Sequence, residues 1–241
     1  MKSSIEEITP IIGTAMDGGF YAGRIRRDDG QVYALIVAPK DGGEIADAEW
    51  IHDWTDVPGA LSYNDGLTNT MAMADAGSRL AQWARWLRIA NHDDWYIPSQ
   101  DELEVIYRNL KPGTAENYCW ARSGINLSAV IPTRHYTPDF PTQTQSDLFK
   151  TGAAEAFDEH LYWTSTRHIA DKDYAWAQDF DDGHQVYSGT NGEFRARAVR
   201  RVPCPCRPQI SHLVIWRPPA VEMVCECDED AQHGWKKLPN T

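Results

Sequence analysis

The stretch that decides the fold is "AWAQDFDDGHQVYSG", residues 175–189 of a chain of 241 residues. Its first half has a period of two, which is the period of a β-strand. This period places three larger side chains on one face of the strand: Trp176, Gln178 and Phe180. Asp182-Gly183 is typical of a tight hairpin turn, and "HQVYSG" has the composition of a return strand. The stretch therefore predicts an antiparallel hairpin.

Further strands are predicted on both sides of this hairpin. "GGFYAGRIR" and "QVYALIVAP" are rich in strand-forming residues, and Asp29-Gly30 between them is a hairpin signal. "NGEFRARAVRRV" alternates small and basic residues, with Ala196 and Ala198 on one face and Arg195 and Arg197 on the other. We expect residues 40–54, which precede the helical part of the chain, to form a loop with aromatic anchors.

Two helices are predicted in the middle of the chain. Residues 70–89 carry large apolar side chains at spacings of three and four, with Asn69 or Thr70 as the N-cap. The second helix, 100–111, begins after Ser99, because Ser99 and Glu102 form the Ser-x-x-Glu capping box. This role accounts for Ser99 without a catalytic function. The Pro- and Thr-rich segment 133–147 reads as a long irregular loop.

Three blocks of sequence, taken in order, carry a resemblance to a known family. They are "GGFYAGRI…YALIVAP…AEW", "DDWYIPSQDELEVIY" and "YWTST…AWAQDFDDG…FRARAVRRV". They resemble the family named for the C-terminal domain of a Legionella collagen-like adhesin. That family is similar to C-type-lectin-like folds, including phage tropism determinants and formylglycine-generating enzymes. The resemblance implies an α+β fold: a C-type-lectin-like domain with two helices and antiparallel sheets, over residues 11–202.

The same resemblance assigns the motif "YWTST" to the framework of the domain. It implies that Trp163 and Trp176 pack inward as core aromatics, and we expect the hydroxyl groups of residues 164–166 to bond to nearby backbone. Calcium-dependent lectins carry Glu-Pro-Asn, Gln-Pro-Asp or Trp-Asn-Asp motifs, and the chain has none of these. Five aspartates could still supply calcium ligands, or could form a solvated rim: Asp171, Asp173, Asp179, Asp181 and Asp182.

The composition changes after Val202. We expect residues 1–10 to be a lead-in and residues 203–241 to be a short C-terminal β appendage that contains cysteines. "SHLVIWRP" and "VEMVCECDED" are the two strands expected in the appendage. Its two Cys-x-Cys pairs fit zinc only loosely, and reduced thiols or disulfides are the alternatives: Cys204, Cys206, Cys225 and Cys227. We therefore expect no cofactor, with zinc or calcium as the alternative.

Composition and charge exclude several classes of function. The net charge is −12, and a chain this acidic lacks the basic surface that phosphate binding requires, so we expect no nucleic-acid partner. No apolar run approaches the ~18 residues that span a bilayer, so we expect no membrane insertion. The N-terminal sequence "MKSSIEEITPIIGTAMDGG" has no apolar core typical of a signal peptide.

These observations favour a binding module that is not an enzyme. The lectin-like fold usually presents loops to ligands outside cells, and a phage virion protein is made in the host cytoplasm and released by lysis. We therefore expect a tail-fibre, tail-tip or baseplate protein, a homo-oligomer that attaches to a host-surface glycan or protein and joins other tail proteins through its appendage. A bacterial surface adhesin is one alternative. A formylglycine-generating enzyme is another, although it needs a cysteine pair in the body, where only Cys119 occurs.

The expected ligand surface lies between the framework blocks, in segments 133–147, 168–174 and 184–195. Tyrosine and arginine are common interface anchors, and asparagine and histidine add adaptable polar contacts. An ordinary polar surface is the alternative for any single residue. The candidates are Arg134, His135, Tyr136, Tyr174, His184, Tyr187, Asn191 and Arg195.

Overall fold

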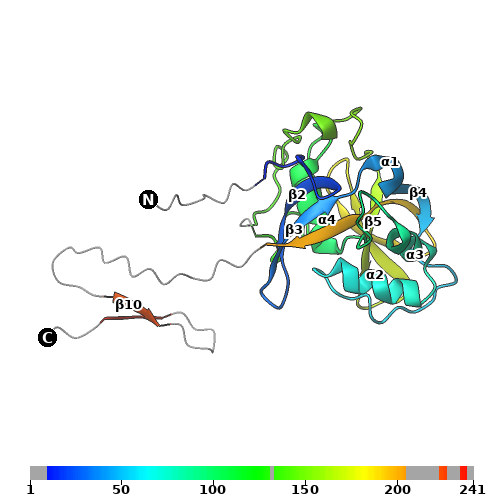
Figure 1. Cartoon of the computed structure of the whole chain (residues 1–241), viewed down its shortest axis with the longest axis horizontal. Coiled ribbons are helices and arrows are strands. Elements are labelled where there is room, and N and C mark those ends of the chain that lie inside the picture. Colours follow the sequence, from blue (N-terminus) through cyan, green and yellow to red (C-terminus); the bar gives the residue numbers. More distant parts are fainter. Residues whose placement is uncertain (1–9, 131–132, 205–222, 227–233, 238–241) are drawn as a thin grey trace. The chain divides into compact units, whose positions relative to one another are not determined.

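The computed structural model of the chain describes residues 10–130, 133–204, 223–226 and 234–237 (Figure 1). The chain divides into two compact units, residues 1–206 and 207–241. In its described residues, the first unit is a mixed α+β domain with two sheets, four α-helical segments and one short 3-10 helix. Among the described residues, no helix combines the length and the apolarity that crossing a membrane requires.

The first sheet has four strands in the order β1-β2-β3-β9. Their bounds are Ala15–Met16, Gly19–Arg26, Val32–Val37 and Val199–Pro203. The hairpin expected around Asp29-Gly30 is present, since Arg27 N donates to Gln31 O and Gly30 N donates to Arg27 O. β9 pairs antiparallel with β3, so the last strand of the domain lies beside one of its first strands.

The second sheet has five strands in the order β4-β8-β5-β6-β7. Their bounds are Glu44–Glu49, Glu193–Arg197, Leu161–Arg167, Tyr174–Asp179 and Gln185–Gly189. The hairpin predicted from the opening stretch is confirmed as β6 and β7, which pair antiparallel. The expectation of a loop over residues 40–54 was wrong in part, because the edge strand β4 and the helical turn α1 (Lys40–Gly43) occupy residues 40–49.

The strand predicted over residues 191–202 is split between the two sheets. It leaves the second sheet after β8 and joins the first as β9, with Ala198 at the crossing. Arg197 is fully buried there: its Nε donates to Ala38 O at 2.9 Å and its Nη1 donates to Glu155 O at 2.9 Å. The predicted alternation of small and basic residues is present. Arg197, however, is buried and links the segments that contain Ala38 and Glu155.

The helix predicted over residues 70–89 is two helices, α2 (Gly66–Asp75) and α3 (Arg79–Trp86). The chain turns at Gly77, whose φ of 96° favours glycine, and Ser78 then caps α3 by accepting from Ala81 N at 3.2 Å. The N-cap of α2 is Asp65, which accepts from Thr68 N at 3.2 Å. The spacing of apolar residues predicted one continuous helix, because both helices contribute apolar side chains to the same core cluster.

The helix predicted after Ser99 is confirmed as α4 (Gln100–Leu110), with the capping box present. Ser99 N donates to Glu102 Oε2 at 2.7 Å. The same carboxylate accepts from Gly66 N at 3.1 Å, at the start of α2, and from the Tyr96 hydroxyl at 2.9 Å. Burial raises the pKa of Glu102, which is completely enclosed. One side chain therefore joins the beginnings of two helices.

α4 contacts strands of both sheets, and its apolar face lies in the largest core cluster. Leu103, Ile106 and Leu110 pack there with strand residues of the first sheet and with Tyr162 of β5. The irregular segment that follows α4 contains a short 3-10 helix, η1 (Asp147–Phe149), and Phe149 reaches the same cluster. The four helices and two sheets differ from the two helices expected, mainly because the first predicted helix is divided and α1 was not foreseen.

The second unit is described only in two strands, β10 (Met223–Glu226) and β11 (Gly234–Lys237), which pair antiparallel. One of the two strands expected in the appendage thus falls within "VEMVCECDED", while "SHLVIWRP" lies outside the described residues. Cys206 and Cys227 also lie outside them, and the zinc hypothesis for the four terminal cysteines stays a prediction.

Glu102 gives the first testable prediction. Glu102→Ala leaves three buried donors without their acceptor, and we expect it to lower the free energy of unfolding by about 3 kcal/mol. Ser99→Ala keeps the backbone N–H that Glu102 accepts from, and Ser99 Oγ has no hydrogen-bond partner, so this variant should cost about 2 kcal/mol at most, the upper end for loss of a cap residue. Urea denaturation of both variants measures the difference. A Glu102→Ala variant as stable as Ser99→Ala would show that this carboxylate does not join the helices.

Candidate functional site

An aromatic cluster covers one face of the β6–β7 hairpin. Trp176 of β6 is paired in register with Tyr187 of β7, and Tyr174 is paired with Gly189. The ring centroids of Tyr174 and Tyr187 are 5.7 Å apart, and those of Trp176 and Tyr187 are 5.5 Å apart. His168, just after β5, lies 4.7 Å from the Tyr187 ring centroid. The period of two of the hairpin therefore collects these rings on one side.

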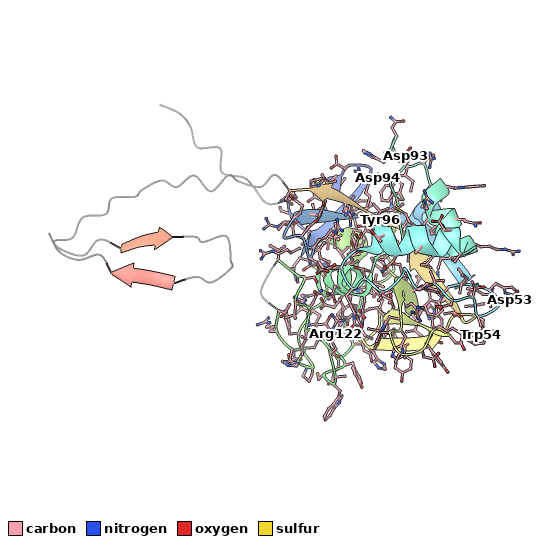
Figure 2. The ribbon with its side chains drawn as sticks, turned by 90° about the horizontal axis from the view of Figure 1, so that it is seen from below. Asp53, Trp54, Asp93, Asp94, Tyr96 and Arg122 are labelled. Carbon is pink, nitrogen blue, oxygen red and sulfur yellow. The ribbon has the colours of Figure 1, made fainter. Side chains whose placement is uncertain are left out.

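Trp54 extends this cluster from a different part of the chain. It lies in the loop after β4, where Asp53 and Trp54 both have left-handed backbone, with φ of 57° and 52° (Figure 2). Such a conformation is costly for two consecutive residues that are not glycine. The Trp54 ring lies over Gly189, where a Cβ atom would stand 3.2 Å from its Cη2. We call the five residues Trp54, His168, Tyr174, Trp176 and Tyr187 the aromatic strip.

The aromatic strip is open to solvent, whereas the opposite face of the hairpin is core. Trp54, Tyr174 and Tyr187 are 44%, 37% and 51% exposed. Ala175 and Ala177 point the other way, into the cluster that contains Trp163. Isolated exposed aromatics are ordinary, but exposed rings in contact on one sheet face make this face the candidate contact surface of the domain.

Of the two tryptophans predicted to be core residues, Trp163 is in the core and Trp176 is not. Trp163 is a core residue as expected, fully buried, and its Nε1 donates to Ala48 O at 2.7 Å. Trp176 is not in the core: it is half-buried on the strip face, against His168 and Tyr187. Trp163 of β5 and Trp176 of β6 point to opposite faces of the sheet, because Trp163 is paired with Ala177, the residue after Trp176. The motif alone did not show this. Thr164 and Thr166 bond to backbone as predicted, through Trp176 O and Ser62 O.

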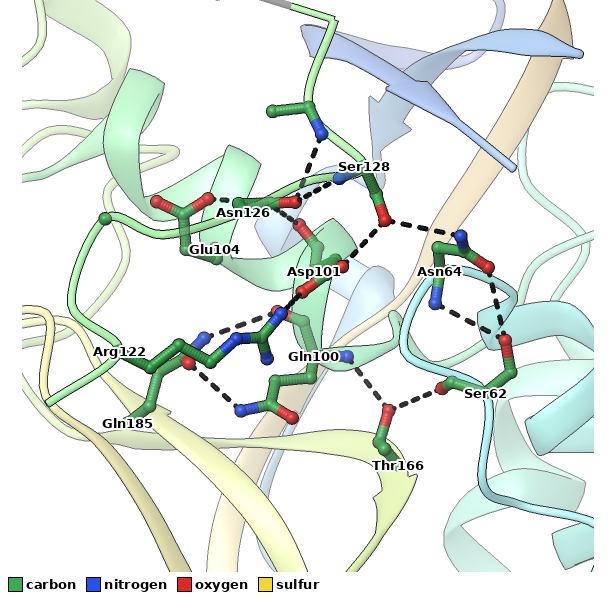
Figure 3. A network of polar contacts seen from close by, with 12 residues as sticks. Ser62, Asn64, Gln100, Asp101, Glu104, Arg122, Asn126, Ser128, Thr166 and Gln185 are labelled. Atoms are coloured by element: carbon green, nitrogen blue, oxygen red, sulfur yellow. Dashed lines mark hydrogen bonds and ion pairs between the residues drawn. The ribbon is translucent and has the colours of Figure 1, made fainter. Parts of the chain in front are cut away.

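A polar network at the start of α4 holds the hairpin in place (Figure 3). Gln100 Nε2 donates to Gln185 Oε1 at 3.0 Å, where β7 begins. Gln185 Nε2 in turn donates to Gln178 Oε1 of β6 at 2.9 Å. Gln100 N donates to Thr166 Oγ1 of β5 at 3.0 Å. These bonds fix the hairpin at one end, and the aromatic strip occupies the same face further along it.

The same network anchors the irregular segment that follows α4. Arg122 donates to Asp101 Oδ1, and Ser128 Oγ donates to Asp101 Oδ2 at 2.7 Å (Figure 3). Asn126 Nδ2 donates to Glu104 Oε2 at 2.6 Å. Burial raises the pKa of Asp101, and the charge of Arg122 opposes that shift. A largely irregular segment is therefore held by buried charges rather than by strand pairing.

Residues 50–200 match the model of the Lcl C-terminal domain family. The match covers more than half of the chain, and includes α4, the aromatic strip and β8. The chain belongs to the Lcl C-terminal domain family. This is the family of the Legionella collagen-like adhesin that the sequence resembles. Family membership indicates an adhesin-like surface module. No curated protein matches the chain.

In this Lcl C-terminal domain, the predicted ligand residues do not form one surface. Tyr174 and Tyr187 belong to the aromatic strip, and Asn191 is exposed in the turn after β7. Arg134 and His135 are exposed on the irregular segment, where the Arg134 guanidinium lies 3.5 Å from the Phe140 ring centroid. Their roles in binding stay predictions. Two further candidates have structural roles, and a third is stacked on a neighbour.

Tyr136 is the clearest correction among these candidates. It is 3% exposed, and its hydroxyl donates to Glu104 Oε1 at 2.7 Å. Burial raises the pKa of Tyr136 well above its usual value. A loop rich in proline and threonine gave no periodic pattern from which an inward side chain could be recognised. Tyr136 therefore anchors its segment to α4 and offers no surface to a ligand.

Arg195 and His184 are also engaged within the domain. Arg195 Nη1 lies 3.0 Å from Asp158 Oδ2 and 3.3 Å from Glu44 Oε1, so its charge is already paired. It lines a cavity of about 580 Å³ that includes none of the strip residues. His184 is half-buried and stacks on Tyr118 with centroids 4.2 Å apart.

The aspartates considered as calcium ligands mostly stabilise turns. Asp171, Asp179 and Asp182 each accept a hydrogen bond from the backbone nitrogen two residues further on. In the part of the chain that the structure describes, no three His, Cys, Asp or Glu side chains are grouped to hold a metal ion.

Sequence reasoning missed Trp54, His168 and Trp176 as members of the site. The signal for Trp176 was present, because Tyr174 and Trp176 are two residues apart on one strand and share a face. Trp54 could not be placed in the same way, because it comes from a loop more than a hundred residues away in the sequence.

Arg122 gives a prediction with a pH dependence. Arg122→Ala leaves the Asp101 carboxylate buried without its cation, which we expect to cost roughly 1–3 kcal/mol at pH 7. The pKa of Asp101 should rise further, so the folded state binds a proton more tightly than the unfolded state, and stability falls as pH rises. The loss should therefore be smaller at pH 5 than at pH 7.

Urea denaturation at the two pH values measures this effect, with the exposed Arg85→Ala as the matched control. An Arg122→Ala variant whose loss of stability is the same at pH 5 and pH 7 would show that Asp101 is not the group it compensates.

Proposed function

We propose that this domain is a recognition module that attaches to a cell surface through the aromatic strip. The observation that carries the proposal is the strip itself: two exposed tyrosines in ring contact on the face of the β6–β7 hairpin, with the exposed Trp54 packed over Gly189, in a domain of an adhesin family. The remaining members, His168 and Trp176, are half-buried and both contact the Tyr187 ring.

Tyrosine and tryptophan suit this role for a physical reason. Each provides a large contact area with few rotatable bonds, so little side-chain entropy is lost when a partner binds. Tyr174 and Tyr187 are already held edge to face, with an interplanar angle of 84°. Since the paired strands fix the positions of both rings, binding requires little rearrangement.

We further propose that the particle carrying the domain is a phage virion, as a tail-fibre, tail-tip or baseplate protein. The support is the resemblance to the fold of phage tropism determinants and the presence of a second unit, 207–241, outside the recognition domain. In this proposal the second unit joins other tail proteins and the assembly is homo-oligomeric. A bacterial surface adhesin is the second candidate, and the family match favours it.

Binding to cells tests the recognition role. Fluorescently labelled protein should adsorb to bacterial cells of a susceptible species, and the triple variant Trp54→Ala/Tyr174→Ala/Tyr187→Ala should lose at least tenfold in affinity. The three side chains are exposed, so the melting temperature should stay close to that of the parent. Trp86→Ala, which removes a tryptophan that is 82% exposed on α3, is the matched control. Equal adsorption of the triple variant and the parent would reject the strip as the contact surface.

Truncation tests the role of the second unit. A chain ending at Cys206 keeps every described core residue, so it should melt cooperatively near the temperature of the full chain. We expect the full chain to sediment with virus particles in a lysate and the truncated chain to remain in the supernatant. Recovery of the full chain in the cell envelope instead would favour the bacterial adhesin.

A further inference from the structure

We propose that residues 120–127, which we call the apolar loop, form a second interaction surface, and that its partner is a protein segment in which apolar side chains are flanked by carboxylates. The loop shares no residue with the aromatic strip, and its role does not depend on the proposed function. Three features support this role: the direction of its side chains, the contacts that hold it, and the charges beside it.

The polarity of the apolar loop is reversed. Trp120, Ile125 and Leu127 are 74%, 36% and 89% exposed. Ser123 and Asn126, which lie between them in the chain, are 4% and 0% exposed. A single exposed apolar side chain is ordinary in a folded protein, but three within eight residues, beside polar side chains that are buried, are not. The reversal therefore indicates apolar side chains that a partner covers.

Asn126 holds the loop in this orientation (Figure 3). Its Nδ2 donates to Asp101 O at 2.8 Å and to Glu104 Oε2 at 2.6 Å, so its side chain is bound to the start of α4. In an extended segment, successive side chains point in opposite directions. Because Asn126 is bound inside the domain, the side chains on either side of it point to solvent.

Trp120 is also held in a fixed position. Its carbonyl oxygen accepts from Ser123 Oγ at 2.7 Å and from Ser123 N at 3.3 Å, which closes a tight turn. Ala121, inside this turn, has a left-handed backbone with φ of 57°. Such a conformation is unfavourable for a residue other than glycine and is retained where the surrounding contacts enforce it. The turn therefore presents the indole ring in a defined place.

The side chains of the loop exclude a sugar as its main partner. Ile125 and Leu127 offer neither a ring face nor a hydrogen bond, so a partner gains from covering them only by bringing apolar surface of its own. A protein and a lipid bilayer both have such surface. A bilayer is fluid and adapts to any arrangement of side chains, whereas a protein surface of fixed shape requires the fixed positions that this loop provides.

The charges beside the loop identify the partner as acidic. Residues 117–138 contain no Asp or Glu, although the chain has 35 of these residues among 241 and a net charge of −12. Arg134 is exposed next to the loop, since a Cβ atom on Gly124 would stand 2.3 Å from Arg134 O. Its guanidinium lies over the Phe140 ring, and it makes no ion pair with a carboxylate of a described residue. Arg134 therefore attracts a local carboxylate, while the net charge of the chain repels an anionic bilayer.

Selection from a library of random 16-residue peptides tests the proposal on the full chain. The library is first depleted on the variant Trp120→Ser/Leu127→Ser and then selected on the parent. We expect peptides that combine aromatic or aliphatic residues with Asp or Glu. A labelled peptide from this set should bind the parent at least tenfold more tightly than the double variant. Failure to obtain any peptide that depends on the loop, or selected peptides without acidic residues, would overturn the proposal.

Matched variants separate the effect of the loop from a general effect of substitution. Trp86→Ala, which removes an equally exposed tryptophan on α3, should bind the selected peptide like the parent. Arg134→Glu should weaken binding about tenfold at 50 mM salt and less at 500 mM salt, because salt screens the charges. Arg85→Glu, an exposed arginine on α3, is its control. Parent-like affinity in Arg134→Glu would reject an acidic partner.

Sedimentation distinguishes two other occupants of the loop. Vesicles containing phosphatidylglycerol should leave the parent chain in the supernatant. If they sediment the parent but not the double variant, the partner is a bilayer and the proposal falls. In analytical ultracentrifugation, the parent and the double variant should have the same mass. A lower mass for the double variant would show that the loop contacts a second copy of the chain, which would also overturn the proposal.

Discussion

The fold depends on the carboxylate of Glu102. It lies at the N-terminal end of α4, where unpaired backbone donors and the helix dipole favour a negative charge. It accepts from Ser99 N of its own capping box, from Gly66 N of α2, and from Tyr96, whose backbone bonds to Val199 of β9. Two helices and the end of the first sheet thus meet at one completely buried side chain. Removal of this acceptor would leave three donors in the core, which is why local and global structure are coupled there.

The second sheet obtains its rigidity in a different way, from the strand that changes sheets. β8 and β9 are separated by Ala198, and the buried Arg197 beside it bonds to Ala38 O, Glu155 O and the Glu155 carboxylate. The charge of Arg197 is balanced by Glu155 and Glu44, so burial does not leave it uncompensated. This crosslink fixes β8, and β8 in turn holds β5, against which the β6–β7 hairpin is built. The aromatic strip is therefore the outermost part of a sheet that is fixed from inside the protein.

Elements with a local signal could be predicted from the sequence, and contacts between distant segments could not. Local sequence signals predicted the β2–β3 hairpin, the β6–β7 hairpin and α4. Turn dipeptides and a capping box involve only a few neighbouring residues, so they can be recognised without the fold. The break between α2 and α3 was missed because apolar spacing continued across Gly77. Tyr136 was taken for a surface residue because its burial depends on Glu104, thirty-two residues earlier. The strip was found in part: Tyr174 and Tyr187 come from one hairpin, but Trp54 joins them only in the folded chain.

The fold holds the members of the strip in two different ways, which bears on the proposed recognition role. Tyr174, Trp176 and Tyr187 are fixed by strand pairing, so their contribution is formed before a partner arrives. Trp54 rests on two consecutive left-handed residues, a conformation held by the surrounding contacts, among them the bond from Lys172 to its carbonyl oxygen. In the proposed function, a partner therefore meets a surface that is already formed at the hairpin, and Trp54 is the exposed ring whose position depends on loop contacts.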